Sequence, residues 1–298
     1  MRISVVIATK DRASYVERAL ASFERQIGAP SFEVIVVDNA STDDTKAVVE
    51  RVAARDVFPV QYVYEPEPNR GKARNRGIEV ASGYLVVFCD DDVQLPPGFL
   101  SAHDTAHNTS NLVVNGPILN VPSYDDRPKP TMANLSRAFL CTCNASVPKH
   151  ALDAVGGFDE DFHLYGWEDT ELGVRLREHG MRWKFAWDAY LWHIKPPTEN
   201  TLEVETRKAI EKARMARRFL QKQPSSRARM ATGAYGVNLV RGKYFLPDGL
   251  LAVYAGLATS EAAPAFLRNL ARAQFLDGMY TRELVRDLPR ARGGRDTE

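Results

Sequence analysis

The chain has 298 residues, of which 44% are hydrophobic and 26% are charged, a composition typical of a globular protein with one large or two small domains. Its 39 basic and 38 acidic residues nearly cancel, so the bulk charge predicts neither nucleic acid nor an acidic polymer as a partner. No stretch approaches the roughly 20 apolar residues that cross a bilayer, and the three cysteines (Cys89, Cys141 and Cys143) cannot all pair internally. We therefore expect a cytoplasmic protein that is not integral to the membrane.

Strand-like and helix-like segments alternate along the first 115 residues. Four apolar runs predict strands, because buried parallel strands read as continuous β-branched and aromatic residues: 2–8, 33–37, 60–64 and 84–89. Helices are expected between them at 14–26, at 44–54 and from the Asn69 region to Ala81. Ser14, and Ser41 or Thr42, are the expected caps of the first two helices. This alternation predicts an α/β fold with a doubly wound, mostly parallel sheet.

The rest of the chain is less regular. The segment 120–130 is rich in Pro, Asp and Ser and predicts an exposed loop. The further elements that we expect are strands at 139–147, 182–187 and 189–194, and helices at 149–155, 168–179, 202–221, 239–257 and 265–276. We therefore divide the chain into a nucleotide-binding half (1–115), a second half (116–198) and a helical C-terminal region (199–298).

An acidic triplet, Asp90, Asp91 and Asp92, directly follows the predicted strand at 84–89. Ligands of open α/β sheets gather beyond the carboxyl ends of such strands. Three adjacent carboxylates repel one another, so a divalent cation with oxygen ligands is expected to neutralise them. The alternative is a solvated acidic turn before Pro96.

The nucleotide-binding motifs of two large enzyme classes are absent. The first predicted strand is not followed by Gly-x-Gly-x-x-Gly, and the chain has no Gly-x-x-x-x-Gly-Lys-Ser/Thr. The sequence therefore disfavours a dehydrogenase and a P-loop enzyme, and it favours a nucleotide bound without either motif.

Two further places carry candidate chemistry. Glu168 and Asp169 open a predicted helix, where the dipole favours the ionised carboxylate that a general base requires. The alternative is that they only complement the helix dipole. His193 lies near the end of a predicted strand, where it is either a structural residue or a metal ligand.

Five segments in order resemble the inverting nucleotide-sugar glycosyltransferases of family 2, which have a GT-A fold with a Rossmann-like sheet. They are SVVIATKDR, VDNASTDDT, NRGKARNRGIEVASGYLVVFCDDD, GWEDTELGVRL and the position of His193. Together they cover about residues 2–197. The resemblance implies that 1–115 binds the nucleotide sugar and that 116–198 binds the acceptor and carries the catalytic base.

The resemblance also implies a role for each matching residue. Asp169 is expected to be the general base that deprotonates the acceptor hydroxyl, with Trp167 and Glu168 shaping the acceptor side. Asp91, Asp92 and His193 are expected to hold Mn²⁺ or Mg²⁺. The residues expected to bind the nucleotide sugar are Thr9, Asp11, Asp38, Asn39, Lys72, Arg74 and Asp90.

Two positions depart from the family pattern. Asn39 stands where many users of uridine-diphosphate sugars have a second Asp that accepts from the uracil N3–H. An Asn oxygen can accept too, but without the charge, so UDP remains the expected nucleotide on weaker grounds. Cys89 stands where an Asp often begins the metal motif, which leaves that task to the acidic triplet.

The predicted activity is transfer of a sugar from a nucleoside-diphosphate sugar to a hydroxyl acceptor (a sugar, a lipid-linked molecule or a small molecule), with inversion. A sugar-phosphate nucleotidyltransferase and a catalytically silent module with the same fold are the alternatives. The C-terminal helices are rich in Arg and Lys. These helices could serve one of three purposes: they pack on their own domain, they contact anionic lipids peripherally, or they form a homodimer.

Overall fold

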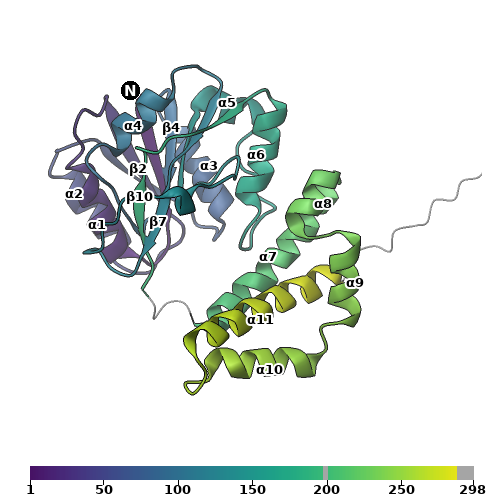
Figure 1. Cartoon of the computed structure of the whole chain (residues 1–298). Helices are drawn as coiled ribbons and strands as arrows, with labels where there is room; N and C mark the ends of the chain where they lie inside the picture. The colour runs from purple at the N-terminus through teal and green to yellow at the C-terminus, as the bar shows by residue number, and fades with distance from the viewer. Residues whose placement is uncertain (197–200, 287–298) are drawn as a thin grey trace, which may run out of the picture. The chain divides into compact units, whose positions relative to one another are not determined.

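The computed structural model describes residues 1–196 and 201–286, and these residues form two compact units (Figure 1). The sheet unit contains residues 1–163 and 168–196, and the helical unit contains residues 164–167 and 201–286. Both predicted halves, 1–115 and 116–198, contribute to the sheet unit, so the boundary between them is not a boundary between compact bodies.

The sheet unit is built on a seven-stranded sheet with the order β3-β2-β1-β4-β8-β6-β9. Its strands are β1 (Ile3–Thr9), β2 (Phe32–Asp38), β3 (Val60–Tyr64), β4 (Leu85–Cys89), β6 (Leu112–Asn115), β8 (Asn144–Pro148) and β9 (Arg182–Phe185). The first four run parallel to one another, and β6 runs parallel to β9. Only β8 is antiparallel to both of its neighbours. The predicted α/β fold with a mostly parallel sheet is confirmed.

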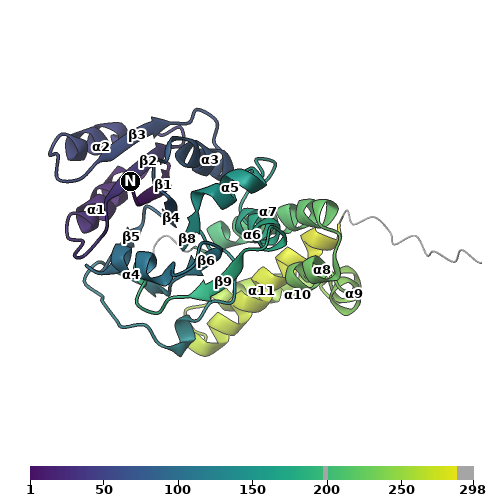
Figure 2. The same cartoon turned by 90° about the horizontal axis from the view of Figure 1, so that it is seen from above.

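Helices cover both faces of this sheet (Figure 2). One face packs against α1 (Ala13–Phe23), α2 (Thr45–Ala53) and α4 (Phe99–Ala106), and the other packs against α3 (Arg70–Val80), α5 (Lys149–Val155) and α6 (Glu168–Glu178). Every residue of β4 is therefore buried. This two-sided burial explains why the strand reads as an uninterrupted apolar run.

A second, smaller sheet has the order β5-β10-β7. Its strands are β5 (Val93–Gln94), β7 (Ile118–Val121) and β10 (Leu191–Ile194). Because β5 directly follows the acidic triplet and pairs with β10, this sheet brings the C-terminal end of the unit next to the end of β4. The predicted loop at 120–130 begins inside β7, and a single 3₁₀ turn, Met132–Asn134, follows it.

One close contact fixes α3 on the sheet. A Cβ placed on Gly77 would lie only 2.4 Å from Cγ1 of Val6 in β1, so the helix backbone rests directly on the strand. Only glycine permits this approach. This contact anchors α3 one turn after Arg74.

Two of the local predictions were wrong for identifiable reasons. The predicted caps do not form. Ser14 lies inside α1, which begins at Ala13, and Ser41 and Thr42 bond to Asp11 and tie the β1 loop to the β2 loop. The predicted strand 139–147 is a strand only from Asn144, since its first residues form a loop held by Asn115 and Asp169.

The helical unit consists of α7 (Leu202–Lys222), α8 (Ser226–Thr232), α9 (Gly236–Tyr244), α10 (Asp248–Thr259) and α11 (Ala265–Val285). The single helix predicted at 239–257 is two helices, because Pro247 cannot continue a helix and disfavours helical backbone in the residue before it. Across the described ranges, no helix is both long enough and apolar enough to span a bilayer.

Candidate active site

The carboxyl ends of β1 and β4 bring Thr9 and Asp91 together. The Thr9 hydroxyl donates to Oδ2 of Asp91 at 2.6 Å, and NH1 of Arg12 donates to Oδ1 at 2.9 Å. Asp91 is only 5% exposed, and burial raises its pKa to about 6. Both oxygens of this predicted metal ligand are thus engaged by side chains from the first loop.

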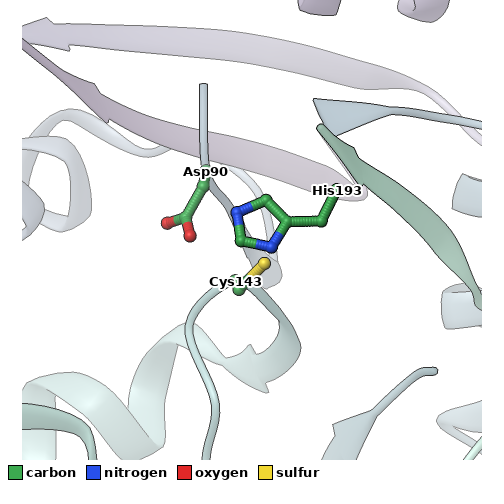
Figure 3. Close-up of side chains that lie close together, drawn as sticks. All are labelled: Asp90, Cys143 and His193. Atoms are coloured by element: carbon green, nitrogen blue, oxygen red, sulfur yellow. The ribbon is translucent and has the colours of Figure 1, made fainter. Parts of the chain in front are cut away.

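Asp90 faces a different set of groups. Its carboxylate, the thiol of Cys143 and the imidazole of His193 place one ligand atom each within 4.8 Å of one another, and the three side chains lie close together (Figure 3). These residues come from the end of β4, the loop before β8, and β10. Carboxylate, imidazole and thiol are all metal-binding groups.

Asp92 also contacts the imidazole of His193. Its Oδ1 lies 3.0 Å from Nε2 of His193, while Oδ2 accepts a hydrogen bond from NH1 of Arg12. The contact follows from the pairing of β5 with β10, in which the Ile194 amide also donates to the Asp92 carbonyl. Oδ1 is buried and has no hydrogen-bond partner in the described part of the chain.

The orientation of His193 is set by a neighbour on β7. Asn120 is its register partner in the small sheet, and Nδ1 of His193 bonds to Oδ1 of Asn120 at 2.9 Å. An amide oxygen only accepts, so Nδ1 carries a proton, and Nε2 is the ring nitrogen that faces Asp92. An imidazole nitrogen and a carboxylate oxygen that lie 3.0 Å apart are both groups that bind metal ions.

Arg74 links this group to the second acidic pair. Its guanidinium lies 3.5 Å from Asp90 and 3.6 Å from Glu168. NH1 of Arg74 and Oε2 of Glu168 are buried without a hydrogen-bond partner among residues 1–196 and 201–286. The triplet and the Glu168-Asp169 pair therefore belong to one site. In that site NH1 of Arg74 can still donate a hydrogen bond and Oε2 of Glu168 can still accept one.

Asp169 is held by the loop before β8. Oδ2 accepts from the Thr142 amide at 2.9 Å, and the Thr142 hydroxyl reaches both carboxylate oxygens at 2.9 and 3.0 Å. Burial raises the pKa of Asp169 to about 6 and the charge of Glu168 adds to the rise, while Arg74 and Thr142 oppose it. This carboxylate is a stronger base than an ordinary Asp and is still ionised at neutral pH.

A pH profile tests this environment. If Asp169 acts as a base, kcat/KM falls as the pH drops through about 6, where the carboxylate takes up a proton. Thr142→Val removes a hydrogen bond that favours the ionised form, so the pKa rises and the acid limb moves upward by about one pH unit. Thr142→Ser keeps the hydroxyl and should reproduce the original profile. A limb that stays in place in Thr142→Val contradicts this account.

The predicted nucleotide-binding residues lie at the ends of β1 and β2 and at the start of α3. Asp38 accepts from the Tyr62 hydroxyl and the Ser41 amide, and the Asn39 amide group donates to the Glu67 carbonyl. Asp11 accepts from the amide and hydroxyl of Thr42, whose bonds lower its pKa. Lys72 pairs with Glu67 at 2.8 Å.

Trp167 makes its contacts in the helical unit. Its indole N–H donates to the Lys212 carbonyl at 2.8 Å, and its ring stacks on Phe219 at 5.7 Å between centroids. Its φ is +76°, which is unfavourable for an aromatic residue. The predicted acceptor-binding role of Trp167 stays a prediction.

Sequence reasoning missed four residues of this site: Arg12, Asn120, Thr142 and Cys143. Arg12 lies inside the SVVIATKDR segment, so its motif was visible although its partners were not. The other three lie in segments that read as an exposed loop and a plain strand. No signal in the sequence pairs them with His193, Asp169 and Asp90.

Comparison with known proteins agrees with this geometry. The sequence matches the model of glycosyl transferase family 2 over residues 4–156 and that of the N-terminal domain of galactosyltransferase over residues 129–207. Validoxylamine A glucosyltransferases from Streptomyces hygroscopicus subsp. limoneus and subsp. jinggangensis are 31% identical in an alignment of 265 residues that covers 75% of this chain. The chain spans 57% and 61% of the length of these two relatives.

Solved structures show the same architecture. The mannosyltransferase PcManGT from Pyrobaculum calidifontis, in complex with GDP-Man and Mn²⁺, aligns with a TM-score of 0.62 and 21% identity over 96% of this chain and 88% of its own. S. aureus TarS 1-349, in complex with UDP-GlcNAc, aligns with a TM-score of 0.57 and 20% identity over 96% and 92%. The expected GT-A fold is confirmed. Because the family match also covers more than half of the sequence, the chain belongs to glycosyl transferase family 2.

Proposed function

We propose that this protein transfers a sugar from a nucleoside-diphosphate sugar to an acceptor hydroxyl, with inversion, and that it uses a divalent cation. The observation that carries the proposal is the position of Arg74, within 3.6 Å of both Asp90 and Glu168. Arg74 thereby connects the acidic triplet with the helix that carries Asp169, although the two lie more than 70 residues apart in the sequence.

Each group then has a chemical task. Asp90, Asp92 and His193 would hold the cation, which when bound offsets the negative charge of the departing diphosphate. Asp169 takes the proton of the acceptor hydroxyl, which makes that oxygen nucleophilic. NH1 of Arg74, which makes an ion pair with Glu168 but no hydrogen bond among the described residues, donates to the donor sugar or its phosphates. This assignment keeps Asp92 and His193 as ligands, and it places Asp90 where the sequence favoured Asp91.

The donor class rests on the relatives. TarS is seen with UDP-GlcNAc, PcManGT with GDP-Man and Mn²⁺, and the Streptomyces relatives are named glucosyltransferases. We infer a UDP-hexose as the donor and Mn²⁺ or Mg²⁺ as the cation, with Thr9, Asp11, Asp38, Asn39 and Lys72 around the nucleotide. The acceptor is a hydroxyl compound of unassigned class.

A panel of nucleotide sugars tests the proposal. Thermal denaturation is measured with UDP- and GDP-sugars, with and without Mn²⁺, and products are analysed after incubation with each stabilising donor. We expect stabilisation that requires the metal, and slow release of nucleoside diphosphate. Release of pyrophosphate from a nucleoside triphosphate and a sugar phosphate would indicate a nucleotidyltransferase instead. Metal-dependent binding without any donor cleavage would indicate a silent binding module.

We infer that the helical unit makes peripheral contact with membranes. Val253, Leu257, Phe266 and Leu270 are exposed on α10 and α11, and basic residues clearly outnumber acidic ones in residues 201–286. Such a surface suits anionic lipid headgroups. Sedimentation with anionic liposomes at low and high salt tests this, and protein that stays in the supernatant at low salt argues against it. A homodimer through this face is the alternative, and gel filtration would detect it.

A further inference from the structure

The cation-binding group contains a sulfur atom that the proposed function leaves without a task. Cys143 contributes its thiol to the group formed with Asp90 and His193, in which the three ligand atoms lie within 4.8 Å of one another (Figure 3). Cys141, two residues earlier on the same loop, is not a member of this group among the described residues, and Cys89 is buried in β4.

Hydrogen bonds from three successive positions hold the loop that carries Cys143. The Cys141 amide donates to Oδ1 of Asn115, the Thr142 amide and hydroxyl donate to Asp169, and the Asn144 amide closes a turn on the Cys141 carbonyl. From Asn144 the chain enters β8, which pairs with the end of β4 at Cys89, next to Asp90. The position of the thiol beside Asp90 is therefore built into the sheet.

We propose that Cys143 is a sulfur ligand of the divalent cation bound by Asp90 and His193, so that this site takes Zn²⁺ or Co²⁺ in preference to Mg²⁺. The inference rests on the proposed function for the presence of a cation. The contact of His193 with Asp92 places a further metal-binding group beside these residues. Nε2 of His193 and Oδ1 of Asp92, a residue only 7% exposed, lie 3.0 Å apart.

The chemistry of the donor set decides the metal. Mg²⁺ prefers oxygen ligands and binds sulfur poorly, whereas imidazole and thiolate favour the later transition metals. When the sulfur–metal bond forms, the Cys143 thiol gives up its proton to solvent, because a coordinating thiol is deprotonated. The thiolate then offsets one more positive charge of the ion, without any oxidation or reduction.

Cobalt reports directly on the sulfur. We would titrate the full-length protein with Co²⁺ in the presence of UDP, with all thiols reduced, and record the near-ultraviolet sulfur-to-cobalt charge-transfer band. The expected result is a band that saturates with the bound metal, persists in the matched control Cys141→Ser and disappears in Cys143→Ser. Competition titrations should show about 10-fold or greater weakening of Zn²⁺ and Co²⁺ binding in Cys143→Ser, while Mg²⁺ binding is unchanged.

The possible outcomes separate this inference from the proposed function. Co²⁺ that binds without a charge-transfer band, and whose binding is lost in His193→Ala, would overturn the sulfur ligand and leave the metal-dependent transferase intact. A band that survives in Cys143→Ser would overturn it as well. Failure of Co²⁺, Mn²⁺ and Mg²⁺ all to bind would overturn both, and equal loss of Mg²⁺ affinity in Cys143→Ser would show a merely structural effect.

Discussion

Asp169→Asn is expected to lower kcat by about 10²- to 10⁴-fold, the usual contribution of a general base, while the affinity for the nucleotide stays the same. The substitution is close to isosteric. The amide oxygen can still accept from the Thr142 amide, and the Thr142 hydroxyl can reverse and accept from the new NH₂ group. The fold of the loop before β8 should therefore survive, and the loss should fall on proton transfer.

Glu168→Gln is the matched control for this experiment. It removes the adjacent charge, which contributes to the raised pKa of Asp169, but it leaves the proposed base in place. Steady-state kinetics and nucleotide titration of both variants give the comparison. A kcat in Asp169→Asn within about threefold of the unmodified protein would remove Asp169 from this role. A larger loss in Glu168→Gln than in Asp169→Asn would transfer the role to Glu168.

Asp90→Asn is expected to weaken metal-dependent nucleotide binding by at least about 100-fold, more than the 10- to 100-fold effect of losing an outer-shell partner. The reason is that Asp90 lies in the group with His193, whereas both oxygens of Asp91 are bonded to Thr9 and Arg12. Titration of Mn²⁺ at a fixed UDP concentration measures the effect.

Asp91→Asn is the matched substitution one residue later. It should leave the Mn²⁺ titration nearly unchanged but lower the melting temperature, because Arg12 loses a buried charged partner, a change worth about 1–3 kcal/mol. The reverse pattern, with a lost metal requirement in Asp91→Asn and none in Asp90→Asn, would restore the ligand assignment that the sequence favoured.

The sequence alone determined the order of the main elements and the family. The runs at 2–8, 33–37, 60–64 and 84–89 are close to β1–β4, because strands covered on both faces must be apolar throughout, and that demand is local. Polar residues directly after these runs could be assigned to the site edge, because parallel strands end at one edge of a sheet. Glu168 and Asp169 could be proposed as site residues because they lie in the segment GWEDTELGVRL, which resembles a family motif.

Only the tertiary structure decided which side chains meet. Asp90 and Asp91 are neighbours in the sequence, yet the first lies with His193 and Cys143 and the second with Thr9 and Arg12. The contacts of Asn120 with His193 and of Thr142 with Asp169 arise from strand register and from a loop that replaces the expected strand. Such contacts join segments tens of residues apart. They depend on how β5, β8 and β10 pair, and strand pairing leaves no periodic signal in a single sequence.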